Sequence, residues 1–418
     1  MKPKFLQIVV IALISAFLGY YIGVSKVSLE WKNFKPKVTV INREPPTADS
    51  SVDFTLFWSV FDKLNTLYYD KTIIDPKKLL NGAISGMVSS IGDPYTVFLP
   101  PVQNSDFKEG LSGQFQGIGA ELGLKDKQII VISPLDGTPA QNSGIKAGDA
   151  ILKVDGKQTA GWTLSQAVEK IRGPKGTQVV LSILHKNSEK AVDIKITRDV
   201  IVVKSVTMWI KKVSEIAGIK LDQKFAESKI AYIRLSQFGD NTNQEWLSLA
   251  NNLSLKLNED KSIKGVILDL RNNPGGYLTD ATFIASEFIK SGTVVIQDKG
   301  NDNKTPFAVS RKGLLTNVPL AVLINKGSAS ASEIVAGAMS DYKRAKLIGE
   351  TSFGKGTIQQ AEDLGNGAGL HVTIAKWLTP NGTWVNGKGL TPDIAVSADE
   401  KDITHDTQLE KAVLELIK

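Results

Sequence analysis

Three serines that alternate with alanines form the part of this sequence best suited to covalent chemistry. They lie in residues 327–334 (GSASASEI), just after the apolar run 320–324, at a predicted strand-to-helix turn. A hydroxyl at a helix N-terminus gains from the helix dipole, and neighbouring amides there can bind an oxyanion. A helix cap is the simpler interpretation, because Glu333 would complete a capping box with Ser330. A cap needs one serine, however, and this run has three.

A single lysine lies downstream among glycines and small residues, in the run 349–359 (GETSFGKGTIQ). The run nearly matches a phosphate-binding loop, but Gly356 stands where that loop needs a metal-binding hydroxyl, so we reject a nucleotide site. A free lysine has a pKa of about 10.4, and it serves as a base at neutral pH only where burial lowers its pKa toward roughly 7–8. The glycine-lined surroundings of Lys355 fit that requirement.

Other chemistries are poorly supported. The chain has no cysteine and three histidines, with no HExxH motif, so we expect no metal site and no cofactor. Residues 340–343 (SDYK) fit the S-x-x-K motif of penicillin-recognising enzymes, but the S-D-N and K-T-G motifs that accompany it are absent. We interpret that segment as a solvated helix end.

Length and composition indicate an ordinary globular protein of two or three domains. The chain has 418 residues, of which 42% are hydrophobic and 22% charged, enough apolar residues for packed cores. The net charge of +7 is small for this length, and no run of five basic residues occurs. We therefore expect no nucleic-acid partner.

Residues 5–24 (FLQIVVIALISAFLGYYIGV) carry no charge, and as a helix they would span about 30 Å, the thickness of a bilayer core. A cleaved signal peptide is the rival interpretation, but the apolar run is long for one and no clean A-x-A site follows it. We favour an uncleaved anchor over residues 1–24. The prediction is a single-pass protein of the cell membrane whose catalytic part is extracytoplasmic.

The remaining patterns predict a multidomain fold of the α+β and α/β classes. Residues 25–50 are expected to form an extended linker. A helical region, a compact unit of short strands and two helices, an α/β core and a closing C-terminal helix follow, at residues 51–112, 113–199, 200–398 and 399–418. In the helical region we interpret the apolar stripe Trp58, Phe61, Leu64 and Tyr68 as core packing.

The compact unit resembles a PDZ domain over its whole length, through the segments SPLDGTPA, GIKAGD and ILKVDG between residues 133 and 156. The resemblance implies that a peptide adds to a sheet edge and that backbone N–H groups hold its terminal carboxylate. The matching loop is GIGA at residues 117–120. The implied peptide-binding residues are Ile118, Gly119, Ala120 and Leu122. Arg172 fits a surface cation and a partner of a carboxylate equally well.

Residues 51–397 resemble the C-terminal processing peptidases, also called tail-specific proteases. The resemblance rests on LDLRNNPGG (268–276), SASASE (328–333), FGKGTIQ (353–359), LTPNG (378–382) and GLTPD (389–393), which occur in the family's order. It implies a serine–lysine dyad. Matched by motif, Ser330 is the nucleophile, Lys355 the general base and Gln359 the residue that orients the lysine.

Backbone N–H groups would bind the oxyanion of such an enzyme. One is expected from Ala331, and the other from Gly275, because Pro274 in the same turn has no N–H. A tight loop that needs glycine also explains that turn, and the two interpretations can hold together. His371, in a strand-like run, is the rival base.

The leading hypothesis is a membrane-tethered serine endopeptidase that recognises protein or peptide substrates with apolar C-termini. One alternative is a PDZ-bearing scaffold whose peptidase core only packs, and another is a related fold that acts on lipids or thioesters. The intact serine, lysine and glutamine argue against the first, and the PDZ unit argues against the second. A homo-oligomer stays open, because packing onto the core explains the N-terminal apolar stripes equally well.

Overall fold

The computed structural model describes residues 13–17, 19–20, 27–32, 35–40, 54–125, 127–135, 137–186, 188–399, 402 and 404–418. The chain divides into two compact units, Met1–Ile84 and Ser85–Lys418. Most of the predicted membrane segment 5–24 lies outside the described residues. Within the described part, no helix is both long and apolar enough to cross a membrane.

The first unit contains a hairpin where we predicted an extended linker. Strands β1 (Val27–Lys32) and β2 (Lys35–Val40) pair antiparallel. The linker prediction for 25–50 is therefore wrong over this hairpin. The missed signal is the alternation of apolar and polar residues in VSLEWK, which is the period of a strand.

Helix α2 (Thr55–Leu67) follows, then the short helix η1 (Lys71–Ile73) and helix α3 (Pro76–Ser89). The helical period was predicted, but the interpretation of its aromatic stripe as core packing is wrong, because no residue of α2 is buried. Its aromatic rings instead contact one another edge-on, with ring centroids 5.0 Å apart for Phe57–Trp58 and 5.8 Å apart for Trp58–Phe61.

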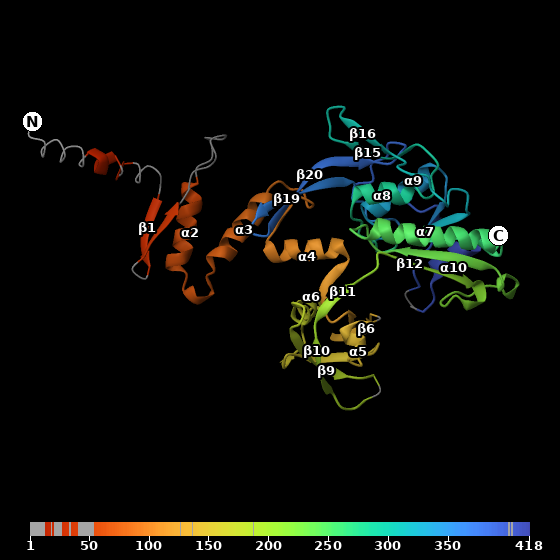
Figure 1. Ribbon diagram of the computed structural model, residues 1–418, viewed down its shortest axis with the longest axis horizontal. Helices are drawn as coiled ribbons and strands as arrows, with labels where there is room; N and C mark the ends of the chain where they lie inside the picture. Colours follow the sequence, from red (N-terminus) through yellow and green to blue (C-terminus); the bar gives the residue numbers. More distant parts are fainter. Residues whose placement is uncertain are drawn as a thin grey trace, which may run out of the picture. The chain divides into compact units, whose positions relative to one another are not determined.

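The predicted PDZ unit lies in the second unit. Its first and last strands along the chain, β4 and β11, pair antiparallel. Strands in the order β10-β9-β7-β6-β5 form its antiparallel sheet, and β8 pairs with β7. Figure 1 labels β6, β9 and β10 of this sheet together with helices α5 and α6. The buried side chains of Ile129, Val131, Ile151, Leu181 and Ile183 form its core. The elements are β4 (Gln114–Gly117), β5 (Ala120–Lys125), β6 (Gln128–Pro134), α5 (Pro139–Asn142), β7 (Ala150–Val154), β8 (Lys157–Gln158), α6 (Leu164–Ile171), β9 (Gln178–Leu184), β10 (Val192–Thr197) and β11 (Asp199–Val202).

A mixed sheet with the strand order β12-β13-β14-β17-β18-β21 forms the α/β core. Strand β12 is antiparallel and the others are parallel. Alternate residues of β14 enter different cores: Val266 and Leu268 pack beneath α7, α8 and α9, whereas Ile267 packs against α10. Both faces are thus covered, as a parallel sheet requires. The bounds are β12 (Val206–Lys212), β13 (Lys229–Leu235), α7 (Thr242–Glu259), β14 (Ile263–Asp269), α8 (Leu278–Ala285), β17 (Leu320–Ile324), α9 (Ala331–Asp341), β18 (Lys346–Gly349), β21 (Ile394–Ala395) and α10 (Thr407–Ile417).

A second sheet, in the order β16-β15-β20-β19 with β3 on β20, stands beside this core. Its long hairpin of β19 and β20 carries Gln359 and His371, two of the residues singled out above. Helix α4 packs against β3 and β20. The remaining bounds are β3 (Val97–Leu99), α4 (Pro101–Ser112), η2 (Val213–Glu215), η3 (Gln223–Phe225), β15 (Thr293–Asp298), β16 (Lys304–Ala308), β19 (Thr357–Gly365) and β20 (Ala368–Leu378).

Candidate active site

Ser330 lies at the turn between β17 and α9, and of the three alternating serines it alone is not buried. The hydroxyls of the other two point inward: Ser328 donates to the Leu270 carbonyl at 2.8 Å and Ser332 to the Asn273 carbonyl at 3.0 Å. Ser330 has φ 56° and ψ −116°. A non-glycine residue rarely adopts this conformation, which costs about 1–3 kcal/mol and persists where the surroundings enforce it. The middle serine is therefore the one of the three that is partly exposed at this turn.

A fully buried carboxylate, that of Glu333, ties this turn to the lysine loop. Its Oε2 accepts the N–H groups of Ser330 at 2.8 Å and Lys355 at 2.9 Å. Its Oε1 accepts the N–H of Gly354 at 2.7 Å and the hydroxyl of Ser352 at 2.6 Å. The sequence interpretation of Glu333 as part of a capping box is therefore correct but incomplete. The same side chain also fixes the backbone that carries Lys355.

Lys355 is a lysine without a counter-charge in contact with it. Its Nζ lies 5.1 Å from the ring centroid of Tyr95, and within the described part of the chain it forms no ion pair. Burial lowers the pKa of Lys355, and the negative charge of Asp93 partly offsets this effect. A buried amine that lacks a paired carboxylate is the kind of lysine that can be neutral near pH 7.

Asp93 is the acid whose charge acts on Lys355, and it is not among the candidate residues that the sequence analysis singled out. Burial raises its pKa, but hydrogen bonds from Thr373 and Thr96 and from backbone N–H groups outweigh burial, so its pKa lies below the ordinary value. The Thr96 hydroxyl donates to Asp93 at 2.6 Å and the Tyr95 N–H at 3.0 Å. Asp93 is thus ionised at neutral pH. No spacing in the sequence linked it to Lys355.

Gln359 is held by two threonine hydroxyls. Its Nε2 donates to the Oγ1 atoms of Thr357 at 2.9 Å and Thr373 at 3.0 Å. Both amide donors are used in this orientation, which leaves the side-chain carbonyl as the atom able to accept from an amine.

His371, the rival base, packs edge-on against Phe107 with ring centroids 4.5 Å apart. Burial and then the positive charge of Lys355 lower the pKa of His371.

The glycine-rich turn after β14 lies directly against the Ser330 turn. A Cβ at Gly275, which has φ 98°, would be 2.8 Å from the Cβ of Ser330 and 2.9 Å from the nitrogen of Ala331. Glycine is required here for close approach. The Gly275 N–H donates to Asn273 Oδ1 at 2.9 Å. The expected oxyanion donor is therefore next to Ser330, and in this structure its hydrogen is shared with an asparagine.

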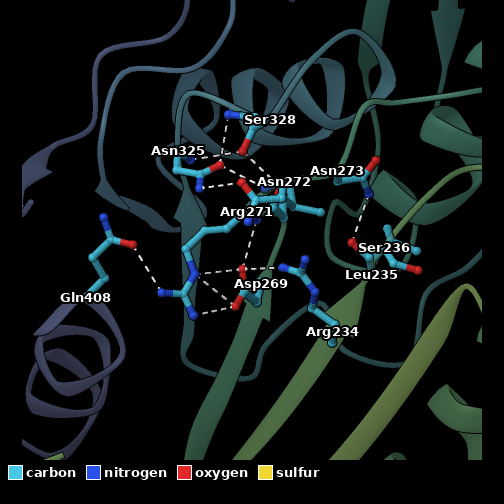
Figure 2. A network of polar contacts seen from close by, with 12 residues as sticks. Arg234, Leu235, Ser236, Asp269, Arg271, Asn272, Asn273, Asn325, Ser328 and Gln408 are labelled. Carbon is cyan, nitrogen blue, oxygen red and sulfur yellow. Dashed lines mark hydrogen bonds and ion pairs between the residues drawn. The ribbon is translucent and has the colours of Figure 1, made fainter. Parts of the chain in front are cut away.

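Reciprocal amide contacts fix that turn to the loop before Ser330, as Figure 2 shows. The Asn272 N–H donates to Asn325 Oδ1 at 2.8 Å, and Asn325 Nδ2 donates to Asn272 Oδ1 at 2.8 Å. Asn273 Nδ2 donates to the Leu235 carbonyl at 2.9 Å. These contacts join the ends of three neighbouring strands, β13, β14 and β17.

An ionic network centred on the buried Asp269 holds the turn to the C-terminal helix (Figure 2). Asp269 accepts hydrogen bonds from Arg234 at 3.0 Å and from Arg271 at 2.7 Å. Arg271 also donates to Asp406 at 2.9 Å and to Gln408 at 3.1 Å. These partners raise the pKa of Arg271 despite its burial. Sequence reasoning missed this network, although an acid and an arginine at the end of an apolar strand were a visible signal.

A second buried acid near the turn leads to a pH-dependent prediction. Burial raises the pKa of Asp280 to about 6, with a further contribution from Asp240. Asn243 Nδ2 donates to Asp280 Oδ1 at 2.8 Å, whereas Asp280 Oδ2 and Asn243 Oδ1 are buried without hydrogen-bond partners among the described residues. A proton on Asp280 would supply the missing donor.

The folded-state pKa of Asp280 lies above its unfolded value of about 3.9, so the protonated acid is the form that stabilises the fold. This stabilisation is complete below about pH 3.9 and is lost as the pH rises through about 6. We expect Asp280→Asn, which mimics the protonated acid, to stabilise the protein by about 1–2 kcal/mol at pH 8 and by little at pH 4.5. Thermal unfolding at both pH values measures this. An equal effect at both would contradict it.

The four implied peptide-binding residues lie in the loop before β5 and at the start of β5, in different environments. Ile118 is 3% exposed and belongs to the PDZ core, whereas Ala120 and Leu122 are half-buried. Gly119 has φ 77°, and its carbonyl accepts the Thr138 hydroxyl at 2.9 Å. Ile118 therefore supports the loop from inside.

Three segments of the chain match described families. Residues 229–396 match Peptidase family S41, residues 104–184 match the PDZ domain, and residues 13–101 match the N-terminal domain of the activating protease CtpB. The carboxy-terminal-processing protease of Bartonella bacilliformis is 40% identical over 341 residues, which cover 81% of this chain and 74% of that protein. The chain belongs to peptidase family S41.

This S41 chain is a serine-type hydrolase related to carboxy-terminal processing proteases. The carboxy-terminal processing protease CtpB of Bacillus subtilis is 35% identical over 393 residues, 90% of this chain and 74% of that protein. A solved photosystem II D1 C-terminal processing protease superposes with a TM-score of 0.50 at 29% identity, over 82% of this chain and 92% of that one. The predicted family, its PDZ domain and its class of enzyme are confirmed.

Proposed function

We propose that this S41 protease cleaves peptide bonds with Ser330 as the nucleophile and Lys355 as its general base. One observation carries the proposal: a single buried oxygen, Glu333 Oε2, accepts the N–H groups of both residues. Two residues far apart in the sequence are thereby held beside each other. Burial lowers the pKa of Lys355, which favours the neutral amine that a base must be.

In the proposed reaction, the amine of Lys355 takes the proton of Ser330 Oγ while this oxygen attacks the carbonyl carbon of the substrate. The tetrahedral intermediate collapses to an acyl-enzyme, and the protonated lysine gives its proton to the leaving amine. Lys355 then activates a water that hydrolyses the ester. We assign to Gln359 the role of holding this amine without adding charge to it, because its side-chain carbonyl is free to accept while its amide donates to Thr357 and Thr373.

The oxyanion of the intermediate is assigned to the N–H groups of Ala331 and Gly275. Ala331 is the first residue of α9, where backbone N–H groups lack helical partners. The Gly275 N–H can bind an oxyanion only if its hydrogen bond to Asn273 Oδ1 breaks or if it donates to both acceptors at once. We therefore expect the turn at residues 271–276 to adjust when substrate binds.

The PDZ domain and the N-terminal segment supply recognition and location in this proposal. The loop at residues 117–120 would hold the free carboxylate of an apolar tail. The uncharged residues 5–24 would tether the enzyme to a membrane with its catalytic part on the extracytoplasmic side. Two measurements test the tether: separation of the cell membranes from soluble protein, and the intact mass of this protein as it is isolated from the cell.

The decisive experiment compares the full chain with Ser330→Ala in detergent. Each protein is incubated with an unfolded polypeptide that ends in a free apolar carboxylate and with the same polypeptide amidated, and the products are followed by mass spectrometry. We expect cleavage that needs Ser330 and prefers the free terminus.

Cleavage that needs Ser330 but ignores the terminus would keep the protease and remove the proposed role of the PDZ loop. Binding of the free tail without any cleavage would favour a peptide-binding scaffold instead.

A further inference from the structure

A groove of about 550 Å³ lies between helix α4 and helix α6 of the PDZ domain, within the unit Ser85–Lys418. Val102 on α4 and Leu164 and Val168 on α6 supply apolar surface. Each helix contributes residues about one turn apart, so one face of each helix forms a wall. The volume suits a short segment of polypeptide.

Carboxylates dominate the charge of the groove. Asp106 and Glu109 line the α4 wall and Glu169 lines the α6 wall, against the single guanidinium of Arg172. Within the described part of the chain, neither Asp106 nor Glu109 forms an ion pair. Glu169 contacts Lys170 at 3.3 Å, where both side chains are more than half exposed, so that pair is weak. The groove therefore presents negative charge that lacks firm compensation.

Arg172 lines the groove and also lies close to Gly117, the first residue of the loop at residues 117–120. The guanidinium carbon lies 4.7 Å from the ring centroid of Phe115. A Cβ at Gly117 would lie 3.7 Å from the Cγ of Arg172. The groove thus begins beside the loop to which the proposed function assigns the terminal carboxylate of the substrate.

The acidic wall on α4 is firmly held by the peptidase. The opposite face of α4 packs on the β19–β20 hairpin, where the buried side chain of Asn104 donates through Nδ2 to the Gly367 carbonyl at 2.9 Å. Phe107 stacks edge-on against His371. Asp106 and Glu109 therefore keep a fixed place, as a specificity element needs.

We propose that this groove selects substrate tails that carry a lysine or arginine a few residues before an apolar C-terminus. The inference rests on the proposed function, because it takes the tail to be held at the PDZ loop. The apolar floor accepts aliphatic parts of the tail, and the carboxylates of Asp106, Glu109 and Glu169 attract its basic side chain and repel an acidic one.

The test uses full-length Ser330→Ala protein and three fluorescein-labelled peptides that end in Ala-Val with a free carboxylate. They carry Lys, Ala or Glu at the third position from the end and are otherwise identical. Fluorescence anisotropy is expected to show at least about fivefold tighter binding of the lysine peptide than of the glutamate peptide, with a smaller ratio in 0.5 M salt. The double variant Asp106→Lys/Glu109→Lys should reverse the order.

The matched control is Glu189→Lys/Glu259→Lys, which changes the net charge equally at exposed positions outside the groove. This control should keep the lysine preference. Equal affinity for all three peptides, or a preference that survives the α4 reversal, would overturn the groove proposal while serine-dependent cleavage still supported the proposed function. Absence of both peptide binding and cleavage would overturn the two together.

Discussion

Lys355→Ala is expected to lower kcat/KM for peptide hydrolysis by about 10⁴-fold, because the variant has no group to take the proton of Ser330. Lys355→Arg should not rescue activity, since a guanidinium stays charged at every usable pH. Steady-state hydrolysis of a labelled peptide measures both variants. Lys326→Ala is the control: it removes an exposed lysine of the Ser330 loop whose nearest acid, Glu350, lies 3.7 Å away. An unchanged rate in Lys355→Ala would exclude the dyad.

The pH profile separates a base from a structural lysine. The rate should follow the neutral fraction of Lys355, so it falls as the pH drops below the lowered pKa of this group. Asp93 raises that pKa, so Asp93→Asn should move the acidic limb of kcat/KM to lower pH. A limb that moves to higher pH, or that does not move, would show that the titrating group is another one. His371 would then be the first to test.

Glu333→Gln is expected to inactivate the enzyme and to destabilise it at the same time. The carboxylate accepts four donors from Ser330, Ser352, Gly354 and Lys355. An amide of the same shape turns one acceptor into a donor that faces other donors, and the unsatisfied buried groups cost roughly 3 kcal/mol or more. We expect the midpoint of thermal unfolding to fall by about 10 °C and kcat/KM by at least about 100-fold.

Two other variants serve as controls for Glu333→Gln. Glu259→Gln changes an exposed carboxylate on α7 that only pairs with Lys256 at 3.5 Å, and it should leave both the unfolding midpoint and the rate unchanged. Lys355→Ala should lose activity with a far smaller loss of stability. A Glu333→Gln protein that unfolds and reacts like the parent would show that the four hydrogen bonds do not organise the site.

Local patterns were enough to predict some regular elements of the Ser85–Lys418 unit. The apolar run at 320–324 became β17, and the two helices expected in the compact unit became α5 and α6. Helix α8 ends at Ala285, because the N–H groups of Glu287 and Phe288 bond three residues back instead of four. Such tightening depends on packing around the helix end, which the period of apolar residues does not encode.

By itself, the sequence determined the family, the order of the domains and the candidate residues Ser330 and Lys355, because these are carried by short motifs whose chemistry is local. Without the resemblance, the sequence did not show which of the three serines is the nucleophile. It indicated no role for Glu333 beyond a helix cap, and it did not indicate that Asp93 acts on Lys355. Those decisions depend on which strand ends meet at one edge of the sheet, and on how burial and hydrogen bonding set charge there. Contacts between residues far apart in the chain exist only once the chain has folded, so only the tertiary structure decided them.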